Sequence, residues 1–163
     1  MAGMAFEEKS KATDLLQLVV FELGGEEFGV EIMNVQEIIR MPEMTQIPHS
    51  PDFVEGVINL RGRIIVVVNL SKRFNMRSKA TDENSRIIVV EIGNAVVGMI
   101  VDSVNEVLRI PASNVEPAPE LVTSKVSRNY LKGVGKIDKR LLILLDLARV
   151  MTVEEVDEIT NLA

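Results

Sequence analysis

The sequence has no cysteine, no tryptophan and a single histidine. Without cysteine there are no disulfides, zinc fingers, iron–sulfur clusters or thiol catalysis, and a reducing compartment is the natural setting. The lone histidine, His49, excludes a metal site built on two histidines, and we expect it to be a loop residue after Pro48. These absences remove most metal-dependent and thiol-dependent enzymes from consideration.

Recognisable catalytic motifs are missing as well. There is no Gly-x-Ser-x-Gly elbow, and Gly133-Val134-Gly135-Lys136 lacks both the spacing and the hydroxyl of a phosphate-binding loop. Carboxylates are numerous, but none stands in a sequence context that marks an acid–base pair. We therefore predict a protein that is not an enzyme and that uses no metal or other cofactor.

Long hydrophobic runs are also absent. The longest aliphatic runs, residues 64–68 and 141–145, have five residues each, whereas a membrane-spanning helix needs about 20. The N-terminus has no basic segment followed by an apolar one, which is the pattern of a secretion signal. We expect a soluble cytoplasmic protein without direct membrane insertion.

Positive charge is scarce overall, because 18 lysines and arginines face 24 aspartates and glutamates, for a net charge of −6. This balance argues against general nucleic-acid binding, which depends on cations that displace counterions from phosphates. One segment is an exception, since residues 61–79 carry six basic side chains and no acidic one. The segment can be a solvated surface or a docking site for an acidic partner. An alternative interpretation makes it the binding strip of a small β-barrel nucleic-acid-binding protein.

An internal repeat is the strongest feature that the chain does have. Residues 21–42 align with residues 90–111 without a gap, and seven of the 22 positions are identical. A second block, residues 56–70, matches residues 133–147 in the same order. Two copies are too few for a solenoid, so the repeat predicts two similar subdomains related by a pseudo-twofold axis.

The local patterns predict an all-β fold with short helices. Residues 1–13 are polar and aperiodic and are expected to form a flexible tail, followed by one domain over residues 14–151 and a C-terminal helix over residues 152–163. The sequence halves run from about 15 to 75 and from 86 to 151, and each is expected to hold about five short strands. We predict two pseudo-symmetric five-stranded β-barrels packed on each other, between which strands can cross.

The two aliphatic runs have no polar residue on either face. Strands of this kind are buried on both faces, and we expect one face to fill its own barrel and the other to meet the second barrel. Asn69 and Asp146 follow these runs as predicted N-caps of short helices, and Thr152 with Glu155 has the spacing of a capping box. Between residues 32 and 39, and again between 101 and 108, the apolar spacing fits either a short helix or a kinked strand.

The most specific motif begins in front of the second repeated block. Residues 53–65 read Phe-Val-Glu-Gly-Val-Ile-Asn-Leu-Arg-Gly-Arg-Ile-Ile, with Val-Gln-Glu-Ile at 35–38 and Val-Val-Gly-Met-Ile-Val-Asp at 96–102. With these motifs the chain resembles the CheW family of bacterial chemotaxis coupling proteins, from about Leu15 to the final helix. The resemblance implies two SH3-like barrels and a non-catalytic adaptor. Such an adaptor joins transmembrane chemoreceptors to a histidine kinase and passes sensory signals toward the flagellar motor.

The same resemblance implies a set of partners. They are the regulatory domain of the chemotaxis histidine kinase, the cytoplasmic tip of chemoreceptors in the groove between the barrels, and further copies of the protein itself in rings. The resemblance also implies a cytoplasmic protein that is recruited to receptor arrays at the membrane. From the net charge of −6 we expect no nucleic-acid partner.

Candidate binding residues follow from the family motifs. Val35 and Glu37 match a receptor-facing position, where an apolar contact beside a carboxylate can seat a helical tip; core packing is the alternative for Val35. Arg61 can donate a bidentate fork to a partner carboxylate, or it can be a solvated turn residue. The glycines are expected to serve backbone geometry more than contact, and Val104 and Val107 fit the groove and the core equally well. The full set is Val35, Glu37, Ile38, Gly56, Asn59, Leu60, Arg61, Gly62, Gly98, Val104 and Val107.

Overall fold

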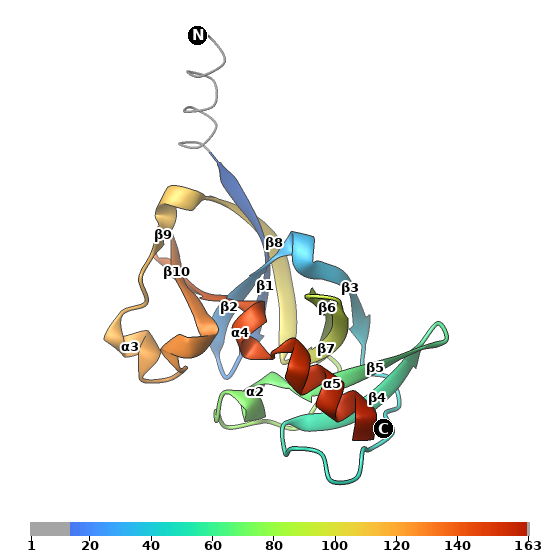
Figure 1. The fold of residues 1–163 in the computed structure, drawn as a ribbon. Coiled ribbons are helices and arrows are strands. Elements are labelled where there is room, and N and C mark those ends of the chain that lie inside the picture. The colour runs from blue at the N-terminus through green and yellow to red at the C-terminus, as the bar shows by residue number, and fades with distance from the viewer. Residues whose placement is uncertain (1–13, 163) are drawn as a thin grey trace.

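A computed structural model describes residues 14–162, which form two β-sheets with short helices at the strand junctions (Figure 1). The six-stranded sheet has the order β8 (Ser103–Pro111), β1 (Leu15–Leu23), β2 (Glu26–Glu31), β11 (Arg140–Leu145), β10 (Leu131–Ile137) and β9 (Val115–Glu116). The five-stranded sheet has the order β3 (Val35–Arg40), β6 (Arg86–Ile92), β7 (Ala95–Val101), β5 (Arg63–Asn69) and β4 (Val54–Leu60). The all-β prediction with two packed barrels is confirmed, and the predicted tail, residues 1–13, lies outside the described residues.

The two sheets have the same plan, although one has an additional strand. In the six-stranded sheet, β9 pairs with β10 through Glu116 and Val134. The corresponding contact in the five-stranded sheet is an isolated bridge between Thr45 and Val57, with backbone hydrogen bonds of 2.8 and 3.0 Å. The additional strand is therefore a longer form of a pairing that both barrels contain.

The repeats exchange their first hairpins. β1 and β2 of the first repeat pair with β8 and β11 of the second repeat, and β6 and β7 of the second repeat pair with β3 and β5 of the first. The exchange is visible in Figure 1, where blue strands of one sheet lie beside yellow and orange ones. Each barrel therefore contains strands of both sequence halves.

Three apolar clusters fill the part of the molecule between residues 14 and 162. A shared cluster between the sheets contains residues of both, among them Phe21, Phe28, Val66 and Ile143. A second cluster lies inside the five-stranded barrel, and a third lies inside the six-stranded barrel. Burial of these side chains is the main favourable contribution to folding.

The aliphatic strands β5 and β11 divide their side chains between these clusters. Ile65 and Val67 fill the five-stranded barrel, whereas Val66 and Val68 face the shared cluster. β11 alternates in the same way, because Leu142 and Leu144 belong to the inner cluster and Ile143 and Leu145 to the shared one. The expected double burial is confirmed from Ile65 onward, but Ile64 is 58% exposed and Leu141 is 37% exposed, because both lie next to hairpin turns.

The helices are short. They are η1 (Ile32–Asn34), α2 (Leu70–Arg73), η2 (Ala112–Asn114), α3 (Glu120–Thr123), η3 (Arg128–Tyr130), α4 (Leu147–Val150) and α5 (Val153–Leu162). In the part of the chain from residue 14 to residue 162, no helix is both long and apolar enough to cross a membrane. Two segments had apolar spacing that fits either a short helix or a kinked strand. The one after residue 31 is one turn of 3-10 helix followed by strand β3, and the one after residue 102 is strand β8.

The predicted helix caps are confirmed. The side chain of Asn69 accepts a hydrogen bond from the backbone N–H of Lys72 at the start of α2, and that of Asp146 accepts from Ala148 at the start of α4. Before α5, Thr152 and Glu155 each accept from the other's backbone N–H, both at 3.1 Å. These bonds satisfy donors that the first helical turn leaves without partners.

Candidate functional site

The predicted site residues lie on three elements of the five-stranded barrel and on one strand of the other barrel. The elements of the five-stranded barrel are β3, the β4–β5 hairpin and β7, and the fourth is β8. β3 and β8 are the outermost strands of their sheets, and they occupy equivalent places in the two repeats. Most of the candidates are therefore on edge strands and on one hairpin tip, where a protein surface is open to partners.

Arg61 and Glu37 form an ion pair between the hairpin tip and β3. Arg61 is exposed over 72% of its side chain and donates through Nη2 to Oε2 of Glu37, which is 25% exposed. The guanidinium of Arg61 retains other donors that face solvent, because only one of its nitrogens contacts Glu37. The structure thus brings together two candidates that are 24 residues apart in sequence.

The β4–β5 turn holds Arg61 in position. Arg61 has a φ of 53° and Gly62 a φ of 84°, and the side chain of Asn59 accepts a hydrogen bond of 2.8 Å from the backbone N–H of Gly62. Leu60 is half-buried and packs against the inner cluster of the barrel. Asn59, Leu60 and Gly62 therefore shape the turn, and Arg61 is the side chain that the turn presents.

Four apolar candidates point toward the seam between the barrels. Val35 and Ile38 are opposite Val90 and Ile88, and both of these belong to the shared cluster. On β8, Val104 and Val107 are likewise opposite Phe21 and Val19 of the same cluster. Val35 and Val104 pack against it, whereas Ile38 is 39% exposed and Val107 is 54% exposed. We call these four residues, Val35, Ile38, Val104 and Val107, the apolar seam strip. On each of the two strands, the first residue packs against the core and the second is exposed to a partner.

The two buried glycines among the candidates have a structural explanation. A Cβ on Gly56, whose φ is 154°, would lie 2.4 Å from the carbonyl oxygen of Thr45, and a Cβ on Gly98 would lie 2.8 Å from Cγ2 of Ile87. The repeat equivalent of Gly56 is Gly133, which has a φ of 147° and the same 2.4 Å approach to a carbonyl oxygen. Gly56 and Gly98 are buried, so they act on a partner only through the backbone that they shape.

The second repeat also has an ion pair at the position equivalent to Glu37, but its arginine partner comes from a strand and not from the tip of a hairpin. Glu106, the equivalent of Glu37, lies 3.5 Å from Arg140 on β11. Arg140 also donates to both carboxylate oxygens of Glu27 on β2, at 3.1 and 2.7 Å. These hydrogen bonds lower the pKa of Glu27 below its usual value of 4.5. Arg140 therefore fastens the exchanged hairpin of the first repeat to the second repeat.

The basic segment at residues 61–79 is largely neutralised. Four of its six basic side chains form ion pairs with carboxylates, and within residues 14–162 the exceptions are Arg63 and Arg77. The pairs are Arg61 with Glu37, Lys72 with Glu55 (3.2 Å), Arg73 with Glu155 (2.9 Å) and Lys79 with Asp82 (3.3 Å). A continuous cationic surface for phosphates or for an acidic partner does not result.

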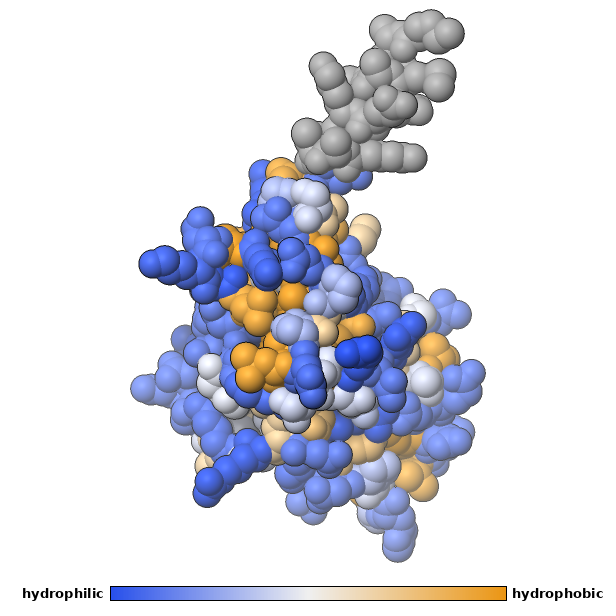
Figure 2. Space-filling model, turned by 90° about the vertical axis from the view of Figure 1, so that its left-hand side faces the viewer, coloured by the Kyte–Doolittle hydropathy of each residue, from blue (hydrophilic) through white to orange (hydrophobic). Residues whose placement is uncertain are grey.

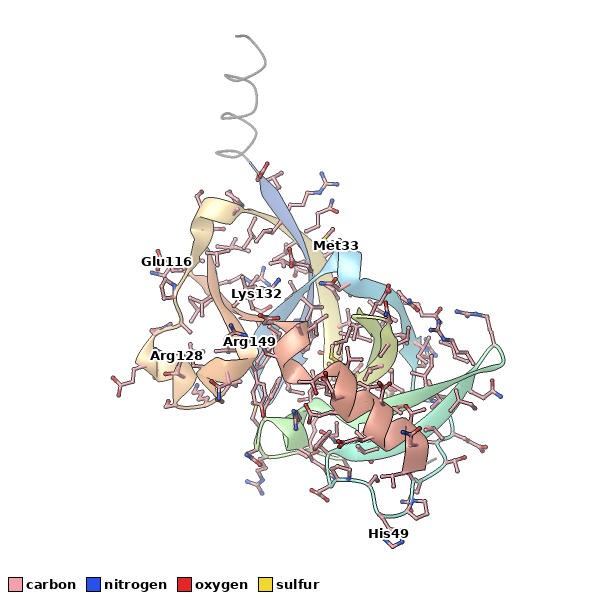
Figure 3. All side chains as sticks on the ribbon, viewed as in Figure 1. Met33, His49, Glu116, Arg128, Lys132 and Arg149 are labelled. Carbon is pink, nitrogen blue, oxygen red and sulfur yellow. The ribbon has the colours of Figure 1, made fainter. Side chains whose placement is uncertain are left out.

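A surface hollow at the seam escaped the sequence interpretation. Its walls come from β1, β2, η1 and β8, and Met33 on η1 is 81% exposed (Figure 3). The hollow has a volume of about 460 Å³ and is lined by Leu15, Leu16, Gln17, Glu31, Ile32, Met33 and Arg109. Only the apolar character of Met33 in a segment of uncertain type could have indicated it, because the walls meet through the hairpin exchange.

Comparisons with known proteins agree with this architecture. The family model for the CheW-like domain matches residues 17–155. The chain is 38% identical to the Chemotaxis protein CheW of Klebsiella aerogenes, over 100% of this chain and 98% of that protein, and 36% identical to the one of Thermotoga maritima, over 83% and 87%. The crystal structure of the scaffolding protein TtCheW from Thermoanaerobacter tengcongensis superposes with a TM-score of 0.79 at 38% identity, over 86% of this chain and 94% of that one. The chain belongs to the CheW family of chemotaxis proteins, which the sequence motifs had indicated.

Proposed function

We propose that this scaffold of the CheW family couples the cytoplasmic tips of chemoreceptors to the chemotaxis histidine kinase. The observation that supports it best is that β3 carries both Ile38 of the seam strip and Glu37, the partner of Arg61, so that one edge strand presents apolar and charged groups. An amphipathic helix can place its apolar side chains on Ile38 and Val107. A carboxylate on the partner can then engage the free nitrogens of Arg61.

Coupling of this kind depends on how the two partners are held relative to each other. Two surfaces on one body hold two partners at a high effective concentration, so that each interface can be weak. Kinase activity changes when receptor signalling alters the geometry or the strength of the contacts that pass through the shared body. Recruitment to receptor arrays follows from the receptor contact and needs no membrane segment in this chain.

The experiment is co-sedimentation with a chemoreceptor cytoplasmic fragment and the histidine kinase, with autophosphorylation of the kinase as a second readout. The test variant is Val107→Asp, which places a charge on the exposed end of the seam strip. Its matched control is Leu121→Asp, because Leu121 is 72% exposed on α3 and outside the strip. We expect the first variant to lose receptor binding about tenfold or more and the control to bind like the wild type. Equal binding by both variants would remove the seam from the proposal, and no binding by the wild type would refute the coupling function.

A further inference from the structure

A small apolar cavity opens at one end of the six-stranded barrel. Its volume is about 240 Å³, and its deep wall consists of side chains or backbone from β1, β2, β9 and β11. Leu18, Leu144 and Leu145 in this wall are no more than 3% exposed. Figure 2 shows apolar surface on this side of the molecule between polar groups. The apolar wall is made by Leu16, Leu18, Gly29, Val115, Leu144 and Leu145.

One ion pair closes the mouth of this cavity. Lys132 on β10 and Glu31 at the end of β2 also line it, and their Nζ and Oε2 atoms are 2.5 Å apart. Their side chains are 43% and 26% exposed, so the charged end of the cavity is the end nearest to solvent. Figure 3 labels Lys132 on the six-stranded barrel. A pocket with an apolar wall and a few convergent polar groups is the usual form of a small-molecule site.

The second barrel provides an internal comparison. The repeat equivalent of Glu31 is Ile100, which is 6% exposed and belongs to the inner cluster of its barrel. The equivalent of Lys132 is Glu55, which pairs with Lys72. In the five-stranded barrel a buried isoleucine thus stands at the position where the six-stranded barrel has Glu31, and the direct pair across the mouth is absent from this barrel.

The interiors of the two barrels also differ, with more free space in the six-stranded barrel. A Cβ on Gly98 would lie 2.8 Å from Ile87 and 3.3 Å from Val67. At the equivalent Gly29, a Cβ would be 3.2 Å from Leu144 and 3.6 Å from Leu18. The space in front of the glycine is therefore less crowded in the six-stranded barrel, so the cavity is a property of one barrel and not of the fold.

The charges at the mouth select the class of ligand. An anion without an ammonium group would displace Glu31 from Lys132 and leave two carboxylates side by side. A cation without a carboxylate would displace Lys132 from Glu31 and leave two positive groups side by side. A zwitterion satisfies both, since its carboxylate can accept from Lys132 while its ammonium group donates to Glu31. A cavity of about 150 Å³ holds benzene, so the present volume suits a molecule of about ten non-hydrogen atoms.

We infer that this cavity binds a free apolar α-amino acid of about the size of leucine. The apolar side chain lies against the leucines of β1 and β11, and the two charged groups of the amino acid replace the direct Lys132–Glu31 contact. The site is separate from the seam strip and does not depend on the proposed coupling function.

The test uses the purified full chain without any partner protein. L-Leucine is titrated while the methyl resonances of Leu18 and Leu144 are followed, and two analogues are titrated in parallel: 4-methylpentanoate, which lacks the ammonium group, and 3-methylbutylamine, which lacks the carboxylate. We expect leucine to shift both sets of methyl resonances and each analogue to bind about tenfold more weakly or worse, because each leaves one charge unpaired.

Two variants locate the site. Lys132→Gln should weaken leucine binding about tenfold or more, and Gly29→Ala should weaken it by narrowing the cavity. The matched control is Lys136→Gln, because Lys136 is on the same strand and forms an exposed 3.0 Å ion pair with Glu116 outside the cavity. Methyl resonances that do not move with leucine would overturn the inference. Equal binding of 4-methylpentanoate, or an equal loss in Lys136→Gln, would also overturn it.

Discussion

Arg73 connects four parts of the molecule, and its replacement should cause a large loss of stability. Its Nε donates to the carbonyl of Val150 at 2.8 Å, and its Nη2 donates to both carboxylate oxygens of Glu155 at 3.0 and 2.9 Å. Its guanidinium carbon also lies 4.6 Å from the ring centre of Phe53 and 5.6 Å from that of Tyr130. With only 17% of its side chain exposed, Arg73 fastens α2 to α4 and to the start of α5.

The expected cost of Arg73→Ala is about 3 kcal/mol. The carbonyl of Val150 loses a donor, which costs about 1 kcal/mol, and the two ring contacts add about 1 kcal/mol. The ion pair adds about 1 kcal/mol and no more, because Glu155 is 33% exposed and water screens part of the attraction. For a chain of this length the change should lower the melting temperature by roughly 10 °C.

Chemical denaturation followed by circular dichroism measures this difference directly. Arg73→Lys should recover less than half of the loss, since an ammonium group cannot reproduce the fork or lie flat on the rings. The control is Arg77→Ala, because Arg77 is exposed on the same segment and has no ion pair among residues 14–162. A stability of Arg73→Ala within about 0.5 kcal/mol of the wild type, or an equal loss in the control, would refute this account of the contact.

Two further changes test the charged contacts. Arg61→Glu should weaken partner binding with a nearly unchanged melting temperature, because Arg61 is exposed and water screens its ion pair. The double variant Glu37→Arg/Arg61→Glu restores the pair but should still fail in co-sedimentation. Full recovery of binding by the double variant would make the pair purely structural. Arg140→Gln should lower the melting temperature in a pH-dependent way. Because the folded-state pKa of Glu27 is lowered, the stabilisation by Arg140 is present above about pH 4.5 and is lost as the pH falls through that folded-state pKa. The difference in melting temperature between wild type and variant should be larger at about pH 7 than at about pH 3, and an equal difference at both would contradict this account.

The sequence predicts those features that short segments determine by themselves. The caps at Asn69, Asp146 and Thr152 depend on donors two to three residues away, so their spacing is sufficient. The two-sided burial of β5 follows from a run without polar residues, and it fails only at Ile64, where pairing with Asn59 puts the residue next to the turn.

The exchange of hairpins and the contacts that result from it could not be located in the same way. β2 pairs with β11, but its alternation would fit β5 equally well, because the repeats have similar patterns. Which strand it meets is decided by packing against the shared cluster, in which Phe28 lies on Ile143 by register. The Arg61–Glu37 pair and the cavity beside Lys132 form only when the exchanged hairpins close the two barrels. No local sequence pattern could therefore indicate either one.

The exchange also bears on how the proposed coupling can work. A barrel that contained only one repeat could loosen without its neighbour, but here each barrel contains a hairpin of the other repeat and both share one apolar cluster. Separation of the barrels would expose Phe21, Phe28 and their neighbours to water, which is strongly unfavourable. The edge strands β3 and β8 therefore keep a fixed relation to each other. A body of this kind can pass a change of receptor geometry to a second partner, because it does not absorb the displacement in a hinge of its own.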